Sequence, residues 1–232
     1  GPETDAPDAS CGPGAGEVCD TAGDEDCDGT ADCADEDCAG AGACAPSCGE
    51  LVRPEDALPL PDGGGTSYQG PIGVTAFADG QTLDSIDAFR GVCVDMEHTW
   101  LRDLQIEISC PSGTTVVLQM FGGQTGSEVF MGQPGPQDDS VPGVGAEYCW
   151  TPTATNPPII DYVNQNPQIH ELPAGDYQSS APMTALLGCP LDGDWTLKVT
   201  DLWAIDSGFL FGWSLRFDPS IVADCSAWPS GP

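Results

Sequence analysis

Basic side chains are scarce in this chain of 232 residues, which has 5 Lys and Arg against 37 Asp and Glu and therefore a net charge of −32. Proteins that grip nucleic acid place cationic side chains against the phosphates, so this scarcity excludes nucleic acid as a direct partner. The same sign of charge disfavours anionic lipid surfaces. Long apolar runs are lacking too, and no stretch approaches the roughly twenty residues of a membrane span.

Histidine is the second scarce residue, with only His98 and His170. The chain also lacks a Gly-x-Ser-x-Gly nucleophile elbow and a glycine-rich phosphate loop that ends in lysine. We therefore expect no catalytic residues. A carboxylate pair that hydrolyses a glycoside would leave no recognisable pattern among 37 acids, and this enzyme alternative is the weaker one.

Cysteine, in contrast, is abundant, and its number is even at 12. Disulfides persist in oxidising compartments, so we expect a secreted protein, located outside the cell or at the cell surface. Seven cysteines lie before residue 49 and five after it, so full oxidation requires at least one bond between the two regions or between chains. Cys225 is the natural candidate, with Cys44 or Cys48 as its partner, whereas a bond between chains would build an oligomer.

Composition divides the chain into five parts. The first 50 residues hold 14 acidic and no basic side chains, and they have too few large apolar residues to build a core. Proline and glycine then accumulate before segments of alternating hydrophobicity begin. We expect an extended tail, an Asp- and Cys-rich segment, a Pro- and Gly-rich linker, a β-sandwich and a C-terminal tail, at residues 1–10, 11–48, 49–65, 66–218 and 219–232 respectively.

Alternation of apolar and polar residues predicts an all-β fold for the second region. Residues 104–109 and 195–200 each place their apolar side chains on one face. Residues 209–217 carry five large apolar side chains on one side, so we expect this strand to line a core. Six or more such strands over about 150 residues predict a β-sandwich.

Acidic residues of the N-terminal region follow the spacing of a calcium-binding loop. From residue 24 to residue 35, acids stand at positions 1, 3, 5, 9 and 12, with Gly29 at position 6. Calcium takes six to eight oxygen ligands, and alternate residues of a tight turn can point inward together. The predicted ligands are five aspartate side chains and one backbone carbonyl, from Asp24, Asp26, Asp28, Thr30, Asp32 and Asp35.

Two alternatives to calcium stay open for this segment. A purely structural acidic spacer, pinned by disulfides, would have no specific metal site. Structural zinc would use the cysteines, but no Cys-x2-Cys pair is present, and the intervening acids are hard ligands that zinc does not require. Because Asp35 stands where the bidentate glutamate of such loops is found, we expect weak calcium affinity, roughly 10⁻⁴ to 10⁻³ M.

Two families resemble parts of this sequence. The runs Asp26-Cys27-Asp28-Gly29 and Asp32-Cys33-Ala34-Asp35 resemble the Asp- and Cys-rich metal-binding repeats of secreted myxobacterial proteins. Two further blocks, residues 97–114 and 193–215, begin with Glu-His-Thr-Trp-Leu-Arg-Asp-Leu and Gly-Asp-Trp-Thr-Leu-Lys-Val-Thr-Asp respectively. Together they resemble the P domain, or homo B domain, of subtilisin-like proprotein convertases.

The P-domain resemblance implies a jelly-roll β-sandwich without catalytic residues of its own. It also favours a structural, hydrogen-bonding role over a catalytic one for His98, which lies within the first block. It also implies two internal disulfides, with the pairing open, among Cys93, Cys110, Cys149 and Cys189. Acids at its turns are candidates for a second calcium site, or else simple turn formers and solvent-facing strand residues: Glu97, Asp103, Asp201 and Asp206.

The sequence therefore predicts a secreted, non-catalytic, calcium-binding structural module of an extracellular or cell-surface assembly, which self-assembles into a homo-oligomer or filament. One alternative is the accessory C-terminal region of a secreted subtilisin-like protease, with that protease as partner. The other is a carbohydrate-binding or adhesive module, in which Trp150, Trp203 and Trp228 stack on sugars instead of covering the edges of the sandwich.

Overall fold

The computed structural model describes residues 48–135 and 141–223. The chain divides into two compact units, residues 1–47 and 48–232, and the described residues all belong to the second unit. Its strands are β1 (Glu50–Pro59), β2 (Ser67–Val74), β3 (Phe89–His98), β4 (Leu104–Ser109), β5 (Thr115–Gln119), β6 (Ala146–Trp150), β7 (Gly175–Tyr177), β8 (Gly193–Asp201) and β9 (Gly208–Phe217). The helices are α1 (Ile159–Gln165) and the 3-10 turns η3 (Ile86–Ala88), η4 (Leu101–Asp103), η5 (Met183–Leu186) and η6 (Pro219–Ile221).

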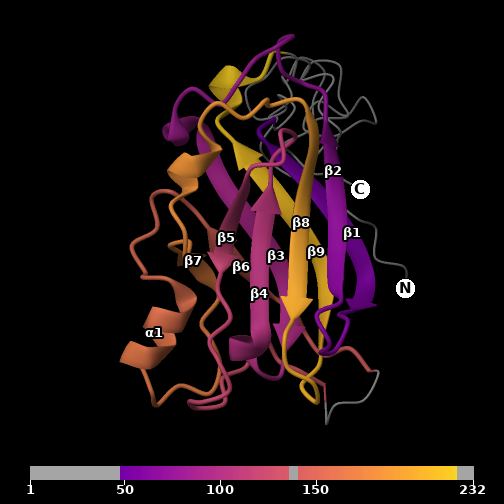
Figure 1. The fold of residues 1–232 in the computed structure, drawn as a ribbon, viewed down its shortest axis with the longest axis vertical. Coiled ribbons are helices and arrows are strands. Elements are labelled where there is room, and N and C mark those ends of the chain that lie inside the picture. The colour runs from indigo at the N-terminus through magenta and orange to yellow at the C-terminus, as the bar shows by residue number, and fades with distance from the viewer. Residues whose placement is uncertain (1–47, 136–140, 224–232) are drawn as a thin grey trace, which may run out of the picture. The chain divides into compact units, whose positions relative to one another are not determined.

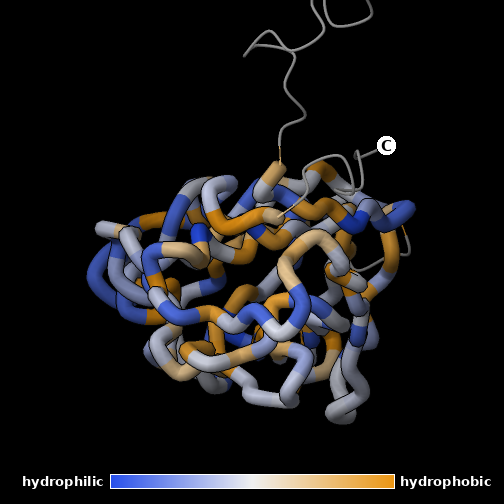
Figure 2. Tube along the Cα trace, turned by 90° about the horizontal axis from the view of Figure 1, so that it is seen from above, coloured by the Kyte–Doolittle hydropathy of each residue, from blue (hydrophilic) through white to orange (hydrophobic). Residues whose placement is uncertain are grey.

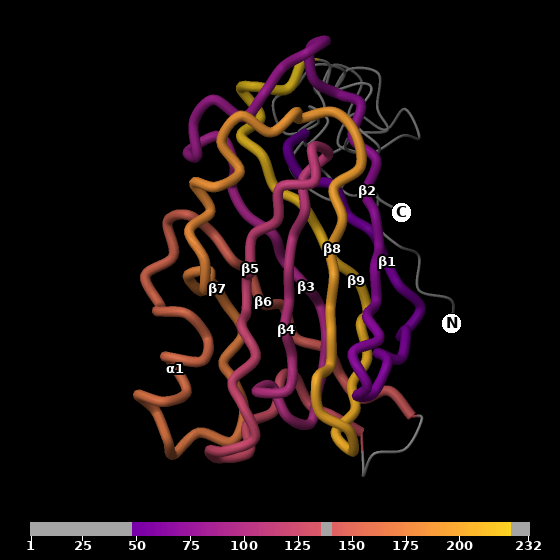
Figure 3. The backbone as a smooth tube through the Cα atoms, in the orientation of Figure 1, coloured from indigo at the N-terminus to yellow at the C-terminus, as the bar shows by residue number. Residues whose placement is uncertain are grey.

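The strands form two sheets, which confirms the predicted all-β sandwich (Figure 1). One sheet has five strands in the order β1-β9-β3-β6-β7, and the other has four in the order β2-β8-β4-β5. Neighbouring strands are antiparallel except β6 and β7, which are parallel. The backbone trace shows that β8 and β9 follow one another in the chain but lie in different sheets (Figure 3).

The core lies between the sheets, where the alternating strands direct their apolar side chains. Along the trace, hydrophobic positions are interspersed with hydrophilic ones (Figure 2). The predicted inward residues of β4 and β8, such as Ile106 and Leu197, are fully buried. An aromatic cluster joins the two sheets, because Phe217 of β9 makes edge contacts with Trp195 and Phe89 at ring-centroid distances of 5.6 and 5.5 Å. Such pairs add directional packing to the burial of large rings.

The predicted linker at residues 49–65 is wrong over most of its length, because residues 50–59 form β1. This strand pairs with β9 at the edge of the five-stranded sheet, and its Leu51 is buried in the core. Proline is tolerated on an edge strand, since one side of the strand needs no ladder hydrogen bond. The register shifts between Pro54 and Leu58, and Ala57 there has a positive φ of 46°, which indicates a β-bulge.

The predicted C-terminal tail also begins too early. Residues 219–221 form η6, which Asp218 caps by accepting a hydrogen bond from the backbone N–H of Ser220 at 2.9 Å. The backbone N–H of Ala223 then donates to the carbonyl of Ala76 at 3.0 Å. The chain is therefore attached to the sandwich up to residue 223, the last described position.

The long stretch between β5 and β8 contains only short elements in the part that the structure describes. It includes β6, the seven-residue α1 and the three-residue β7.

Within the part of the chain that the structure describes, no helix has the length and hydropathy needed to cross a membrane.

Candidate functional site

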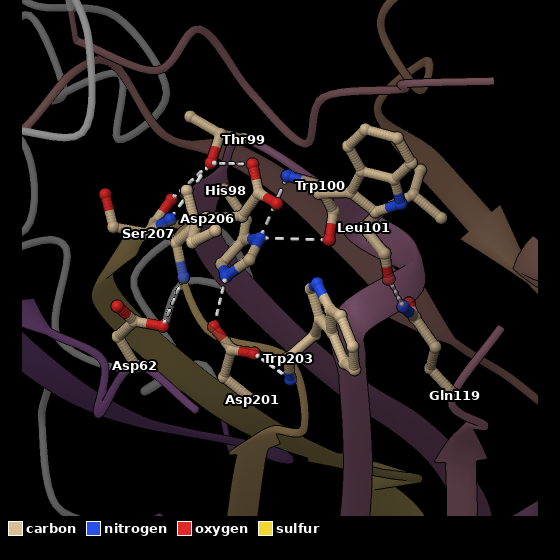
Figure 4. Close-up of polar contacts among 11 residues, drawn as sticks. Asp62, His98, Thr99, Trp100, Leu101, Gln119, Asp201, Trp203, Asp206 and Ser207 are labelled. Carbon is tan, nitrogen blue, oxygen red and sulfur yellow. Dashed lines mark hydrogen bonds and ion pairs between the residues drawn. The ribbon is translucent and has the colours of Figure 1, made fainter. Parts of the chain in front are cut away.

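Polar side chains gather at one end of the sandwich, where β3 and β8 end and η4 and the β8–β9 loop begin (Figure 4). Strand pairing brings these segments together, since Leu104 lies opposite Asp201 and His98 lies opposite Gly208. The two blocks that resemble a P domain, far apart in the sequence, therefore meet at one site. Its polar members are His98, Asp103, Asp201 and Asp206, which we call the aspartate cluster.

His98 is wholly buried, and both of its ring nitrogens have partners. Nε2 lies 3.2 Å from Oδ2 of Asp201, and Nδ1 lies 3.1 Å from the backbone nitrogen of Trp100. With the proton on Nε2, the ring donates to Asp201 and accepts from the Trp100 amide. A general base needs a nitrogen that can reach a reacting group, so this geometry favours the structural role expected for His98.

The second oxygen of Asp201 holds the β8–β9 loop. Oδ1 accepts the backbone N–H of Trp203 at 2.9 Å, and the backbone N–H of Leu202 donates to the carbonyl of Asp103 at 3.0 Å. Asp206 closes the other side of the loop, where its Oδ1 accepts from the Thr99 hydroxyl at 3.3 Å. The bonds to the two carboxylates are charge-assisted, and bonds of this kind position backbone segments strongly.

Asp103 is the least satisfied member of the aspartate cluster. Its side chain is 1 % exposed, and its Oδ2 has no hydrogen-bond partner within the described part of the chain. Burial, followed by the negative charges of Asp201 and Asp206, raises the pKa of Asp103 to about 7. The protonated and ionised forms of Asp103 are therefore both populated near neutral pH.

Three of the four residues predicted for a second calcium site lie at this end of the sandwich, although their carboxylate oxygens do not all lie within 4.8 Å of one another, and Glu97 does not join them. Adjacent residues of a strand point to opposite faces, so Glu97 faces away from its neighbour His98. It lines a small cavity with Thr99 and Ser207, where burial is the main cause that raises its pKa. Calcium binding at the three aspartates stays a prediction.

Among the described residues, one group places three potential metal-ligand atoms close together: Cys93, Glu147 and Cys149. Its two sulfurs are bonded to each other, so they are not available as thiolate ligands. The predicted N-terminal calcium loop, residues 24–35, lies outside the described residues, as do Cys44 and Cys225.

Two disulfides cross-link the sandwich, as the resemblance implied, and the structure supplies their pairing. Cys93–Cys149 joins directly opposed residues of β3 and β6, and Cys110–Cys189 joins the end of β4 to the loop before β8. Cys48 is disulfide-bonded as well. All five cysteines in the described ranges are thus oxidised, which agrees with an oxidising compartment.

The structure describes two of the three tryptophans proposed for sugar stacking, and they differ in exposure. Trp150 is fully buried in β6, so the prediction that it contacts sugars is wrong. Strand alternation and the pairing of β6 with β3 turn its ring into the core. Trp203 is 43 % exposed on the β8–β9 loop, and Trp228 lies outside the described residues.

Sequence reasoning missed two surface features beside the aspartate cluster. One is the exposed apolar loop around Trp203. The sequence does contain a signal for this loop, because large apolar residues stand in the turn that follows a strand. The other is a cavity of about 500 Å³, lined in part by Thr99, Phe130 and Asp206. No local pattern predicts this cavity, because its walls come from segments far apart in the chain.

Comparisons with known proteins identify no family. No protein-family model matches the sequence, and no curated protein matches it. Two solved structures are similar over 72 % of this chain: the serine protease of Aeromonas sobria, with 16 % identity and a TM-score of 0.35, and the complex of that protease with its chaperone, with 17 % identity and a TM-score of 0.36. The match spans 26 % of each of those chains. A TM-score of this size establishes neither a shared family nor a shared function.

Proposed function

We propose that this chain is a secreted, non-catalytic structural module, calcium-binding through its N-terminal loop, which serves in an extracellular or cell-surface assembly. The observation that carries the non-catalytic part is the state of His98. Its ring is fully buried, with one nitrogen on Asp201 and the other on the Trp100 backbone. The His98–Asp201 pair therefore serves to hold the β8–β9 loop in place.

Cross-linking supports the structural and extracellular parts of the proposal. The two internal disulfides close loops with sequence separations of 56 and 79 residues. Each removes conformational freedom from the unfolded chain, which contributes roughly 4 kcal/mol of stability in the chain-entropy model. A module stabilised in this way can persist outside the cell, where no chaperone refolds it.

Calcium binding rests on the spacing of acids at residues 24–35. Neighbouring carboxylates about 4 Å apart repel by roughly 1 kcal/mol per pair in water, and a divalent ion reverses the sign of that interaction. Isothermal titration with calcium should show a site with a dissociation constant of roughly 0.1 to 1 mM. A variant with Asp26→Asn and Asp28→Asn should lose it, whereas Asp161→Asn, at an exposed position of α1, is the control.

The assembly role predicts that particle size depends on calcium. Light scattering of the oxidised chain should show a homo-oligomer or filament with calcium and smaller particles after EDTA. A strictly monomeric particle under both conditions would argue against self-assembly. Activity screens on peptides and glycans should be negative, and turnover that survives further purification would overturn the non-catalytic part.

A second candidate function is the accessory region of a secreted subtilisin-like protease. The observation that favours it is the pairing of the two P-domain-like blocks, since β4 from the first block lies beside β8 from the second. The sequence of the precursor protein distinguishes these two candidate functions. A peptidase encoded in frame upstream supports the accessory role, and a signal peptide that directly precedes this chain opposes it.

A further inference from the structure

The β8–β9 loop exposes an unusual set of side chains for a protein with so many acids. Leu202, Trp203 and Ile205 are 37 %, 43 % and 73 % exposed, and we call them the apolar tip. They account for three of the eight exposed large apolar residues in the described part of the chain, within four positions. Contiguous exposed apolar residues, unlike scattered ones, mark interaction sites.

Hydrogen bonds hold the apolar tip in one conformation. The aspartate cluster fixes the backbone of Trp203 and Leu202, and the backbone N–H of Ile205 donates to Oδ1 of Asp62 at 3.1 Å (Figure 4). Ile205 has a φ of 105°, which is costly for a β-branched residue. Strain of this kind persists where the surroundings impose it, and it concentrates at functional sites.

An acidic cavity of about 500 Å³ adjoins the apolar tip, because Asp206 of the same loop lines it. Glu128 and Glu171 contribute two more carboxylates to its wall, and Phe130 contributes an aromatic ring. An aromatic ring beside carboxylates provides both cation–π and ion-pair contacts for a basic side chain.

None of the residues that line this cavity is a lysine or an arginine. All five basic residues of the chain lie within the described ranges, and each is engaged by another residue of the sandwich. The pairs are Arg53 with Glu55, Arg90 with Asp218, Arg102 with Asn164, Lys198 with Glu107, and Arg216 with Glu50 and Glu147. Charge complementarity therefore calls for a basic partner.

We propose that the apolar tip and the acidic cavity together form a docking surface for a polypeptide segment that combines basic and large apolar side chains. Lysine or arginine enters the cavity near Glu128, Glu171 and Asp206, and apolar residues pack on Trp203 and Ile205. Rigid aromatic side chains are well suited to this use, because little conformational freedom is lost on binding. The inference rests on the proposed role in assembly, and it names the chemistry of the partner.

The observations favour this occupant over two others. A second copy of the chain would bring another net charge of −32 toward an acidic surface. An anionic lipid surface would be repelled for the same reason, and a neutral bilayer would leave the acidic cavity unpaired.

The test uses the full oxidised chain and a 15-residue peptide of alternating lysine and leucine as the probe. Peptides of lysine with serine and of glutamate with leucine serve as controls for charge and for hydrophobicity. The tip variant is Trp203→Ser with Ile205→Gly, which also removes the strained φ. The cavity variant is Glu128→Gln with Glu171→Gln, and the surface control is Leu187→Ser, which is 45 % exposed after η5.

We expect titration at low salt to show at least tenfold weaker binding of the lysine–leucine peptide for the tip variant and for the cavity variant. Leu187→Ser should stay within twofold of the unchanged chain. Equal binding of the lysine–leucine and lysine–serine peptides, or unchanged binding by the tip variant, would overturn the proposal.

Two parallel measurements address the other occupants. Sedimentation of vesicles made of phosphatidylcholine, with binding lost in the tip variant, would assign the tip to membranes and overturn the proposal. Self-association that is lost in the tip variant alone would assign it to a second copy. Failure of calcium binding in the N-terminal loop leaves all these readouts unchanged, so failure of this inference is distinguishable from failure of the proposed function.

Discussion

At the scale of single residues, the buried acids of the aspartate cluster combine a structural role with an electrostatic cost. Asp201 is satisfied by His98 and by the Trp203 amide, whereas Oδ2 of Asp103 has no hydrogen-bond partner within residues 48–135 and 141–223. Burial disfavours the ionised form of such a group. Replacement of Asp103 therefore distinguishes two hypotheses: that its carboxylate only destabilises the folded chain, or that it also binds a metal ion.

Replacement of Asp103 by asparagine should stabilise the chain in EDTA at pH 8, by about 1 to 3 kcal/mol. The folded pKa is about 7, raised from 3.8, so ionisation at higher pH costs the folded state more than the unfolded state. This cost is absent below pH 4, grows as the pH rises to 7 and is constant above. Urea unfolding of both proteins at pH 4 and pH 8 measures it.

The sign of the Asp103→Asn effect is the decisive feature. Equal stability at pH 4 with a gain at pH 8 agrees with the raised pKa, and a loss at pH 8 in EDTA contradicts it. Calcium that stabilises the unchanged sandwich but not the variant would support an ion at the three aspartates.

At the scale of elements, β1 shows how an edge strand can hide in a sequence rich in proline. Leu51 is its only wholly buried residue, and most of its other side chains are partly or fully exposed. The alternation that identifies a strand lining the core is therefore weak here. Its assignment comes from pairing with β9, over positions that begin at Glu50 opposite Arg216.

Leu51→Ala should lower the free energy of unfolding by about 2 to 4 kcal/mol, because it removes packed methyl groups from the core. The adjacent Val52→Ala is the matched control, since Val52 is 49 % exposed, and it should stay within about 0.5 kcal/mol. Denaturant unfolding of the two variants compares them directly. Equal, small effects would mean that residues 50–59 behave as the linker that composition predicts.

At the scale of the whole molecule, residues 48–223 contain a complete core and two disulfides of their own. The acids of residues 24–35 belong to the other compact unit. We therefore expect that the sandwich keeps its stability, and residues 1–47 keep the calcium site, when the chain is divided between the two units.

A fragment of residues 48–232 should fold with a melting temperature within a few degrees of the sandwich transition of the full chain. It carries Cys48→Ser and Cys225→Ser, so that no free thiol is left whichever cysteines these two residues bond. EDTA should leave its melting unchanged, while it lowers the protease resistance of residues 1–47 in the full chain. Calorimetry and limited proteolysis measure the two effects. If EDTA lowered the melting temperature of the fragment, this division would be contradicted. Calcium would then be assigned to the aspartate cluster.

The sequence by itself determined the fold class, because the alternation in β4, β8 and β9 directly reflects one buried and one outer face of each strand. It also indicated an oxidising compartment and marked His98, Asp103 and Asp201 as residues of interest. Tertiary structure alone decided the disulfide pairs, since four cysteines permit three pairings and only strand neighbourhood selects one. It placed Trp150 in the core, turned Glu97 away from the aspartates and built the acidic cavity, because each depends on which distant segments lie side by side.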